Sequence, residues 1–266
     1  MVPKGLRVAT ATLAGAALLT LGTPVAARDV VRDGFAFPED GTLNIVVFRP
    51  DVSVGSQQVT GMIVPKADWT EEARTNIKQS LIARAASFNA QVQFVDELEG
   101  EHAALLTEYR ALYEKVAGAI FNHLIAGETL PTKQKVIPDP RKPSGRGKKV
   151  DLLDWSLGPG TARLKEVTGA DYAMFVYTYD AYGDTGRKAS QVVSALTCTL
   201  LFCDIPGSGV HAGYAALVEL STGNIVWFNS DPEMGGDVRI AEGAAKRVAQ
   251  LMEGFPVRPT IIVQEQ

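Results

Sequence analysis

The segment Tyr172–Tyr179, which reads YAMFVYTY, constrains the fold of this chain more than any other. Its residues are apolar or aromatic at nearly every position, so a strand formed here would leave neither face to water. Strands of that kind lie in the middle of a sheet that helices cover on both sides. We therefore expect this segment to be a central, fully buried strand.

Strand and helix patterns alternate on both sides of this segment. Short apolar runs predict strands at 45–48, 92–95, 212–220 and 224–229, and the last two meet at a turn containing Gly223. Apolar residues at three- and four-residue steps predict a helix capped by Asp68 and helices covering 101–126, 161–167, 187–196 and 237–252. The apolar stripe of the first helix is Ala73, Ile77, Leu81, Ala85 and Phe88, and that of the second is Leu105, Tyr109, Leu112, Val116, Ile120 and Leu124. The predicted fold class is α/β (mixed α+β): a mixed β-sheet covered by helices, with a C-terminal β-hairpin and a closing helix.

The first 27 residues have the character of a targeting segment. Lys4 and Arg7 precede an apolar stretch over 8–21, and the small residues at 25–27 (VAA) form a cleavage pattern. The stretch is shorter than the ~20 residues of a membrane span. We expect a signal peptide, cleaved before Arg28, that exports the chain to the periplasm. An uncleaved membrane anchor is the alternative, and outer-membrane association stays open.

The rest of the chain is expected to form one domain. A polar, irregular lead-in covers 28–41, a single α/β domain covers 42–258, and a tail covers 259–266. No second apolar stretch is long enough to span a bilayer, so no membrane span is expected after cleavage. The net charge of −4 argues against nucleic acid as a partner, since nucleic-acid binders carry a basic excess.

Residues 128–150 stand out as a basic, proline-rich segment without apolar periodicity, which predicts a long exposed loop. Between 133 and 149, one acid, Asp139, is set against seven basic residues. These are Lys133, Lys135, Arg141, Lys142, Arg146, Lys148 and Lys149. We expect them to contact a polyanion, either anionic lipid headgroups or a charged envelope polymer. The alternative is a merely solvated loop.

The two cysteines, Cys198 and Cys203, are separated by four residues. In an oxidising compartment this spacing predicts a short disulfide loop, and two buried thiols are the alternative. The spacing differs from the C-x-x-C of redox sites, and two cysteines alone make a weak metal site.

No motif in the chain points to catalysis. The three histidines are His102, His123 and His211, and the first two would lie roughly 30 Å apart on one helix. The chain has no H-E-x-x-H and no G-x-S-x-G sequence. Acidic clusters at 96–101 and 231–237 could bind calcium, but they also complement helix N-termini. We therefore predict no catalytic, cofactor-binding or metal-binding residue and no cofactor.

The stretch 169–256 resembles a known family. Its parts are the strand TGADYAMFV, the hairpin AGYAALVELSTGNIVWFN and a closing helix that ends in GFP. They resemble bacterial envelope proteins with the TolB amino-terminal-domain-like, or CsgG-like, α/β fold. The resemblance covers about a third of the chain and implies envelope assembly work without catalysis. Lipoprotein members carry a lipidated Cys after the signal, and this chain has none there.

These observations predict a non-catalytic periplasmic interaction or assembly factor of the bacterial cell envelope, whose partners are other envelope proteins. The alternative is a periplasmic hydrolase whose site is not visible in the sequence. The strand 224–229 is expected to offer a sheet edge to a partner through Ile225 and Trp227. The alternative is that Trp227 and its neighbour Phe228 both lie in the core.

Overall fold

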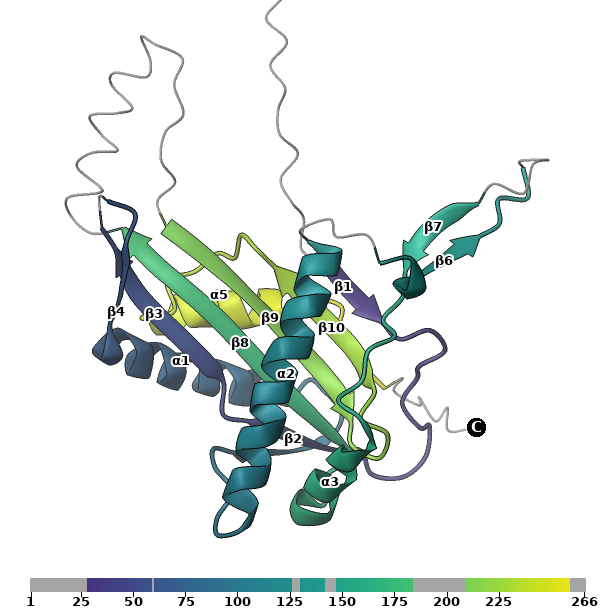
Figure 1. Ribbon diagram of the computed structural model, residues 1–266. Helices are drawn as coiled ribbons and strands as arrows, with labels where there is room; N and C mark the ends of the chain where they lie inside the picture. Colours follow the sequence, from purple (N-terminus) through teal and green to yellow (C-terminus); the bar gives the residue numbers. More distant parts are fainter. Residues whose placement is uncertain (1–27, 59, 126–129, 142–146, 184–208, 259–266) are drawn as a thin grey trace, which may run out of the picture.

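The computed structural model describes residues 28–58, 60–125, 130–141, 147–183 and 209–258 (Figure 1). The fold is mixed α/β, as predicted: one eight-stranded sheet carries helices on both faces, and a separate two-stranded sheet stands to one side. The predicted signal peptide, the helix expected at 187–196, both cysteines and the tail lie outside the described residues.

The main sheet is built around β8, the strand predicted to be central. Its order is β1-β10-β9-β8-β2-β5, while β3 also pairs with β8 and β4 pairs with β3. The strands β9, β10 and β1 run antiparallel to their neighbours, whereas β2 and β3 pair with β8 in parallel. Their bounds are β1 Arg28–Val31, β2 Asn44–Phe48, β3 Asp51–Gln57, β4 Ile63–Pro65, β5 Gln91–Val95, β8 Tyr172–Gly183, β9 Gly209–Glu219 and β10 Ile225–Asp231.

Two helices pack on each face of this sheet (Figure 1). α1 and α5 contribute to one hydrophobic cluster, and α2 and α3 contribute to the other. Short 3-10 turns, η1 and η2, precede β6 and α3. The bounds are α1 Ala67–Ala85, α2 His102–Leu124, α3 Ala162–Thr168, α5 Ala241–Leu251, η1 Pro131–Lys133 and η2 Pro159–Thr161.

The alternation of side chains along each strand explains why both faces need cover. In β2, Ile45 and Val47 join the cluster under α1 and α5, whereas Val46 and Phe48 join the cluster under α2 and α3. β8 divides its side chains in the same way, which confirms that the YAMFVYTY segment is buried on both faces.

Two helix starts differ from the predicted ones. α1 begins one residue before Asp68, and no side chain caps it. The last helix begins at Ala241 rather than at Asp237. The reason is local, because Asp237 Oδ1 accepts hydrogen bonds from the backbone N–H and the Nε–H of Arg239. Those bonds hold residues 237–239 in a turn that precedes the helix.

Three strands of the main sheet were not predicted. β1 lies in the expected irregular lead-in, and β3 and β4 lie in a stretch whose glycines, Gly55 and Gly61, are typical of loops or bulges. Gly55 is needed for the pairing of β3 with β4, since a Cβ there would lie 2.8 Å from Ile63 Cγ2 and 3.0 Å from the carbonyl oxygen of Val64. The glycine therefore permits a close strand approach instead of marking a loop.

The expected edge strand is not an edge. β1 pairs along β10 on the side opposite β9, so both edges of β10 are hydrogen-bonded. Ile225 and Trp227 are fully buried, and Phe228 is buried on the other face. The prediction of a partner contact through Ile225 and Trp227 is therefore wrong, and the alternative, aromatic core on both faces, holds.

Residues 128–150 are not a featureless loop. β6 (Gln134–Ile137) and β7 (Lys148–Asp151) form an antiparallel hairpin that is separate from the main sheet. Both faces of this hairpin carry exposed side chains. Its sequence therefore lacks the alternation of apolar and polar residues that identifies a half-buried strand. No helix in the described part of the chain has both the length and the apolarity that a bilayer crossing requires.

Candidate functional site

The β6–β7 hairpin projects from the body of the protein (Figure 1). Directly opposed residues include Val136 with Lys149 and Ile137 with Lys148, so each face of the hairpin pairs an apolar side chain with a lysine. Val136 is 54% exposed and Ile137 is 49% exposed. Apolar side chains next to cations therefore stand in water at the end of a projecting element.

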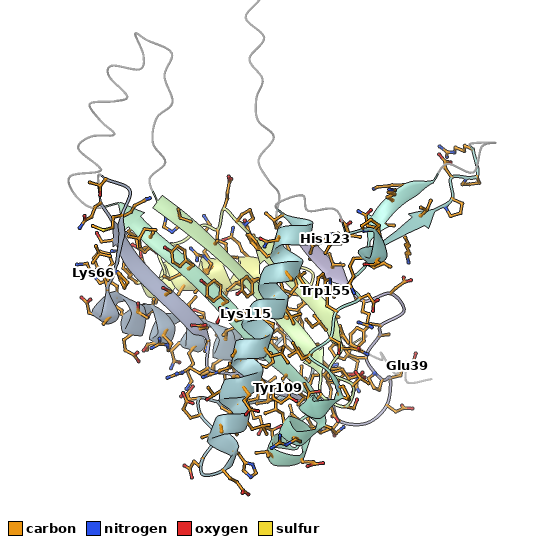
Figure 2. The ribbon with its side chains drawn as sticks, in the orientation of Figure 1. Glu39, Lys66, Tyr109, Lys115, His123 and Trp155 are labelled. Carbon is orange, nitrogen blue, oxygen red and sulfur yellow. The ribbon has the colours of Figure 1, made fainter. Side chains whose placement is uncertain are left out.

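The base of the hairpin is fixed to the body. Lys133 Nζ donates to the carbonyl oxygen of Asp154 at 2.5 Å and lies 4.8 Å from the ring centre of Trp155. Lys135 Nζ pairs with Asp33 at 2.5 Å. Figure 2 places Trp155 on the side of the body from which the hairpin leaves. These contacts fix the orientation of the hairpin relative to the body. They also occupy Lys133 and Lys135, two of the seven cations predicted to bind a polyanion.

The other five cations divide into two groups. Arg141, Lys148 and Lys149 are exposed, and no acidic side chain within the described ranges lies within 4.0 Å of the ammonium of Lys148 or Lys149. Lys142 and Arg146 lie outside the described residues. Among the described cations of the predicted set, Arg141, Lys148 and Lys149 are therefore exposed, and the polyanion contact itself stays a prediction.

A cavity of about 250 Å³ opens where β2 gives way to β3. β8 pairs with β2 up to Met174 and with β3 from Tyr177, so the intervening part of β8 faces this break. Aromatic side chains from three elements line the cavity: Tyr113 from α2, Phe175 and Tyr177 from β8, and Tyr214 from β9. The sequence alone does not indicate this cavity, because its lining residues come from different elements and lie far apart along the chain.

The aromatic rings of the cavity are packed in stacked pairs. The rings of Tyr177 and Tyr214, direct partners across β8 and β9, have centroids 4.7 Å apart. Those of Tyr113 and Phe175 lie 4.6 Å apart. Stacking of this kind holds large side chains in single orientations, so the cavity wall is preformed.

A buried ionic network lies at the far end of β8. Asp180 and Arg247 are both fully buried, and Arg247 donates from Nη1 at 2.9 Å and from Nη2 at 2.8 Å to the two carboxylate oxygens. His211 Nδ1 lies 2.7 Å from Asp180 Oδ1, and Thr178 Oγ1 donates to Oδ2 at 3.0 Å. Burial alone would raise the pKa of Asp180, but the hydrogen bonds from His211 and Arg247 outweigh it, and the pKa lies below its ordinary value.

This network ties α5 to β8 and β9, which gives it a structural role. His211 is held in this network by its hydrogen bond with Asp180. The other two histidines lie at opposite ends of α2: His123 is buried 3.5 Å from Asp151, and His102 lies at the N-terminus beside Glu101. Within the described residues, no group of three or more His, Cys, Asp or Glu side chains could hold a metal ion.

Comparison with known proteins gives only distant similarity. No protein-family model and no curated protein matches the sequence. Among solved structures, a PelC dodecamer from Paraburkholderia phytofirmans has 10% sequence identity and a TM-score of 0.36, covering 88% of this chain and 99% of that chain. A single-site variant of that PelC dodecamer has 11% identity and a TM-score of 0.33, covering 85% and 98%. With TM-scores below 0.5, these matches support no conclusion about what this chain does or how it assembles.

Proposed function

We propose that this protein is a non-catalytic interaction and assembly factor of the bacterial cell envelope, which works in the periplasm after its signal peptide is removed. The observation that carries the proposal is the β6–β7 hairpin, an anchored element that holds Val136 and Ile137 in water away from the main core. The resemblance of residues 169–256 to envelope proteins supports the cellular setting.

An isolated hairpin is a weak structure on its own. Two strands without a covering layer are marginally stable in water, and their outer edges leave backbone groups unpaired. A partner that covers Val136 and Ile137 or pairs with one edge would stabilise the hairpin and gain binding energy from it. Lys148 and Lys149 flank the apolar pair and favour a partner surface that carries acidic groups. We therefore propose other envelope proteins with acidic surfaces as the partners.

The same lysines carry the proposed polyanion contact, and replacing them tests it. Each Lys near an anionic surface contributes about 1 kcal/mol, so the double variant Lys148→Gln/Lys149→Gln should bind about thirtyfold more weakly. The measurement is co-sedimentation of the purified protein with phosphatidylglycerol-containing vesicles. Binding by the native protein should also fall as salt is added.

The matched control for this experiment is Arg84→Gln/Arg163→Gln. It removes the same charge from two exposed arginines on α1 and α3, away from the hairpin. We expect this control to bind like the native protein. Equal binding by the hairpin variant, the control and the native protein would show that the hairpin lysines are merely solvated.

A further inference from the structure

We propose that two copies of this protein pair through β5, the strand at one end of the main sheet, and so form a dimer with one continuous sheet. This inference rests on β5 alone and is independent of the β6–β7 hairpin. Among the described strands, β5 pairs only with β2. Its other edge is the surface on which the second copy would lie.

The backbone of β5 directs hydrogen-bonding groups away from the sheet. The N–H of Gln91 donates to the carbonyl oxygen of Leu43, directly before β2, at 2.8 Å. Successive residues of a strand present their backbone groups to opposite edges, so those of Val92 and Phe94 point away from β2. No residue in the described part of the chain is hydrogen-bonded to the N–H or C=O groups of these two residues. The outer edge of β5 is therefore free to pair with another strand.

β5 also lacks the features that protect a sheet edge. Proteins protect such edges with short strands, charged residues, proline or bulges. The other marginal strands of this sheet have such features: β1 has four residues and contains Arg28 and Asp29, and β4 has three residues and ends at Pro65. β5 has the sequence QVQFV, without a charge or a proline, and its register with β2 is uninterrupted. An open strand of this kind favours pairing with a further strand.

The sequence of β5 complements itself when a second copy runs antiparallel about a two-fold axis at Gln93. Val92 of each copy then lies opposite Phe94 of the other, and the two residues exchange both of their backbone hydrogen bonds. Val92 and Phe94 are partly buried against the cluster under α1 and α5, so apolar side chains meet apolar side chains on that face. On the opposite face, the exposed Gln93 side chains of the two copies lie across the axis from each other.

The charges that follow β5 are compatible with this register. Asp96 and Glu97 come directly after the strand. With Gln93 on the axis, they lie opposite Ala90 and Asn89 of the other copy, so no like charges meet. A parallel pairing of two copies would instead set the acids side by side. The antiparallel dimer thus satisfies the backbone, the apolar side chains and the charges without a second kind of protein.

The first test is sedimentation-equilibrium ultracentrifugation of the purified protein from about 1 to 300 μM. We expect a reversible dimer with a dissociation constant of roughly 10–100 μM, because two short strands bury less area than the about 1,200 Å² of a stable interface. Val92→Pro should abolish the dimer, since proline removes an outward N–H and places its ring at the edge. The ladder between β5 and β2 does not use this N–H, so the fold should be kept.

A pair of charge variants tests the register and does not depend on the folding of the proline variant. Gln93 is exposed, and its side chain makes one exposed hydrogen bond, from Nε2 to the carbonyl oxygen of Thr168 at 2.8 Å. Gln93→Lys and Gln93→Glu each set like charges opposite each other, so each alone should dimerise up to about fivefold more weakly than the native protein. An equimolar mixture should form a heterodimer at least as stable as the native dimer, because opposite charges then meet.

The matched controls are Gln79→Lys and Gln79→Glu, at an exposed glutamine on α1. Each should dimerise like the native protein, and mixing them should change nothing. The inference is overturned if the native protein stays monomeric up to about 300 μM, or if folded Val92→Pro dimerises like the native protein. It is also overturned if the mixed Gln93 variants dimerise no better than either variant alone.

Discussion

Replacing Asp180 by Ala is expected to lower the free energy of unfolding by roughly 3–5 kcal/mol, because it leaves the fully buried guanidinium of Arg247 without its counter-charge. The measurement is urea unfolding at pH 7. The double variant Asp180→Leu/Arg247→Met, which removes both charges, should be more stable than the single one, since no unpaired charge remains. A double variant as unstable as Asp180→Ala would contradict this account of the network.

The same variant has a defined dependence on pH. The pKa of Asp180 is lowered in the folded protein, so its contribution to stability is fully present above the ordinary carboxyl pKa of 3.8 and is lost as the pH falls through the folded pKa. The stability difference between the native protein and Asp180→Ala should therefore narrow below about pH 4. A difference that stays constant from pH 7 to pH 3 would show that packing, not charge, causes the effect.

Replacing Trp227 by Ala is expected to cost about 3–5 kcal/mol of stability, the range found for large aromatic side chains in cores. Trp227 is fully buried, and its ring lies 5.1 Å from that of Phe255. Chemical unfolding measures the loss. Leu112→Ala is the control: Leu112 is 41% exposed on α2, so its replacement should cost less than about 1 kcal/mol.

This prediction also separates a core role from an interface role for Trp227. If the free energy of unfolding of Trp227→Ala lay within about 1 kcal/mol of the native value, and the variant no longer bound partner proteins, Trp227 would act at a surface. Because β10 is hydrogen-bonded to β1 on one edge and to β9 on the other, we expect a large loss of stability instead.

Most of the fold could be predicted from the sequence because buried faces of helices and strands require apolar residues at regular spacings. β8 is apolar throughout since both of its faces are covered, and α1 buries the predicted Ala73, Ile77, Leu81 and Ala85. In α2 the predicted apolar stripe was partly wrong: it included Leu112, but the structure exposes Leu112 and buries Tyr113. Leu112 and Tyr113 are neighbours, and a helical pattern read with a tolerance of one residue fits either of them. Periodicity alone therefore cannot tell which of the two is buried.

The elements that the sequence did not predict are short or exposed strands, in which burial produces no recognisable pattern of apolar residues. β1 has four residues, and the β6–β7 hairpin exposes both faces. The cavity was out of reach for a different reason, since Tyr113, Phe175 and Tyr214 come from three elements that only the sheet topology brings together. The pairing of Asp180 with Arg247, 67 residues apart, was hidden in the same way.

The most direct test of the proposed function is photo-cross-linking in intact cells with a photoreactive residue in place of Ile137. Matched controls carry the same residue in place of Ile82 on α1 and Leu112 on α2, which are also exposed apolar positions. We predict discrete adducts with other envelope proteins from position 137, which disappear when Lys148 and Lys149 are also replaced by Gln, and no adducts from the two control positions. No adduct at position 137, or adducts of equal yield at all three positions, would contradict it.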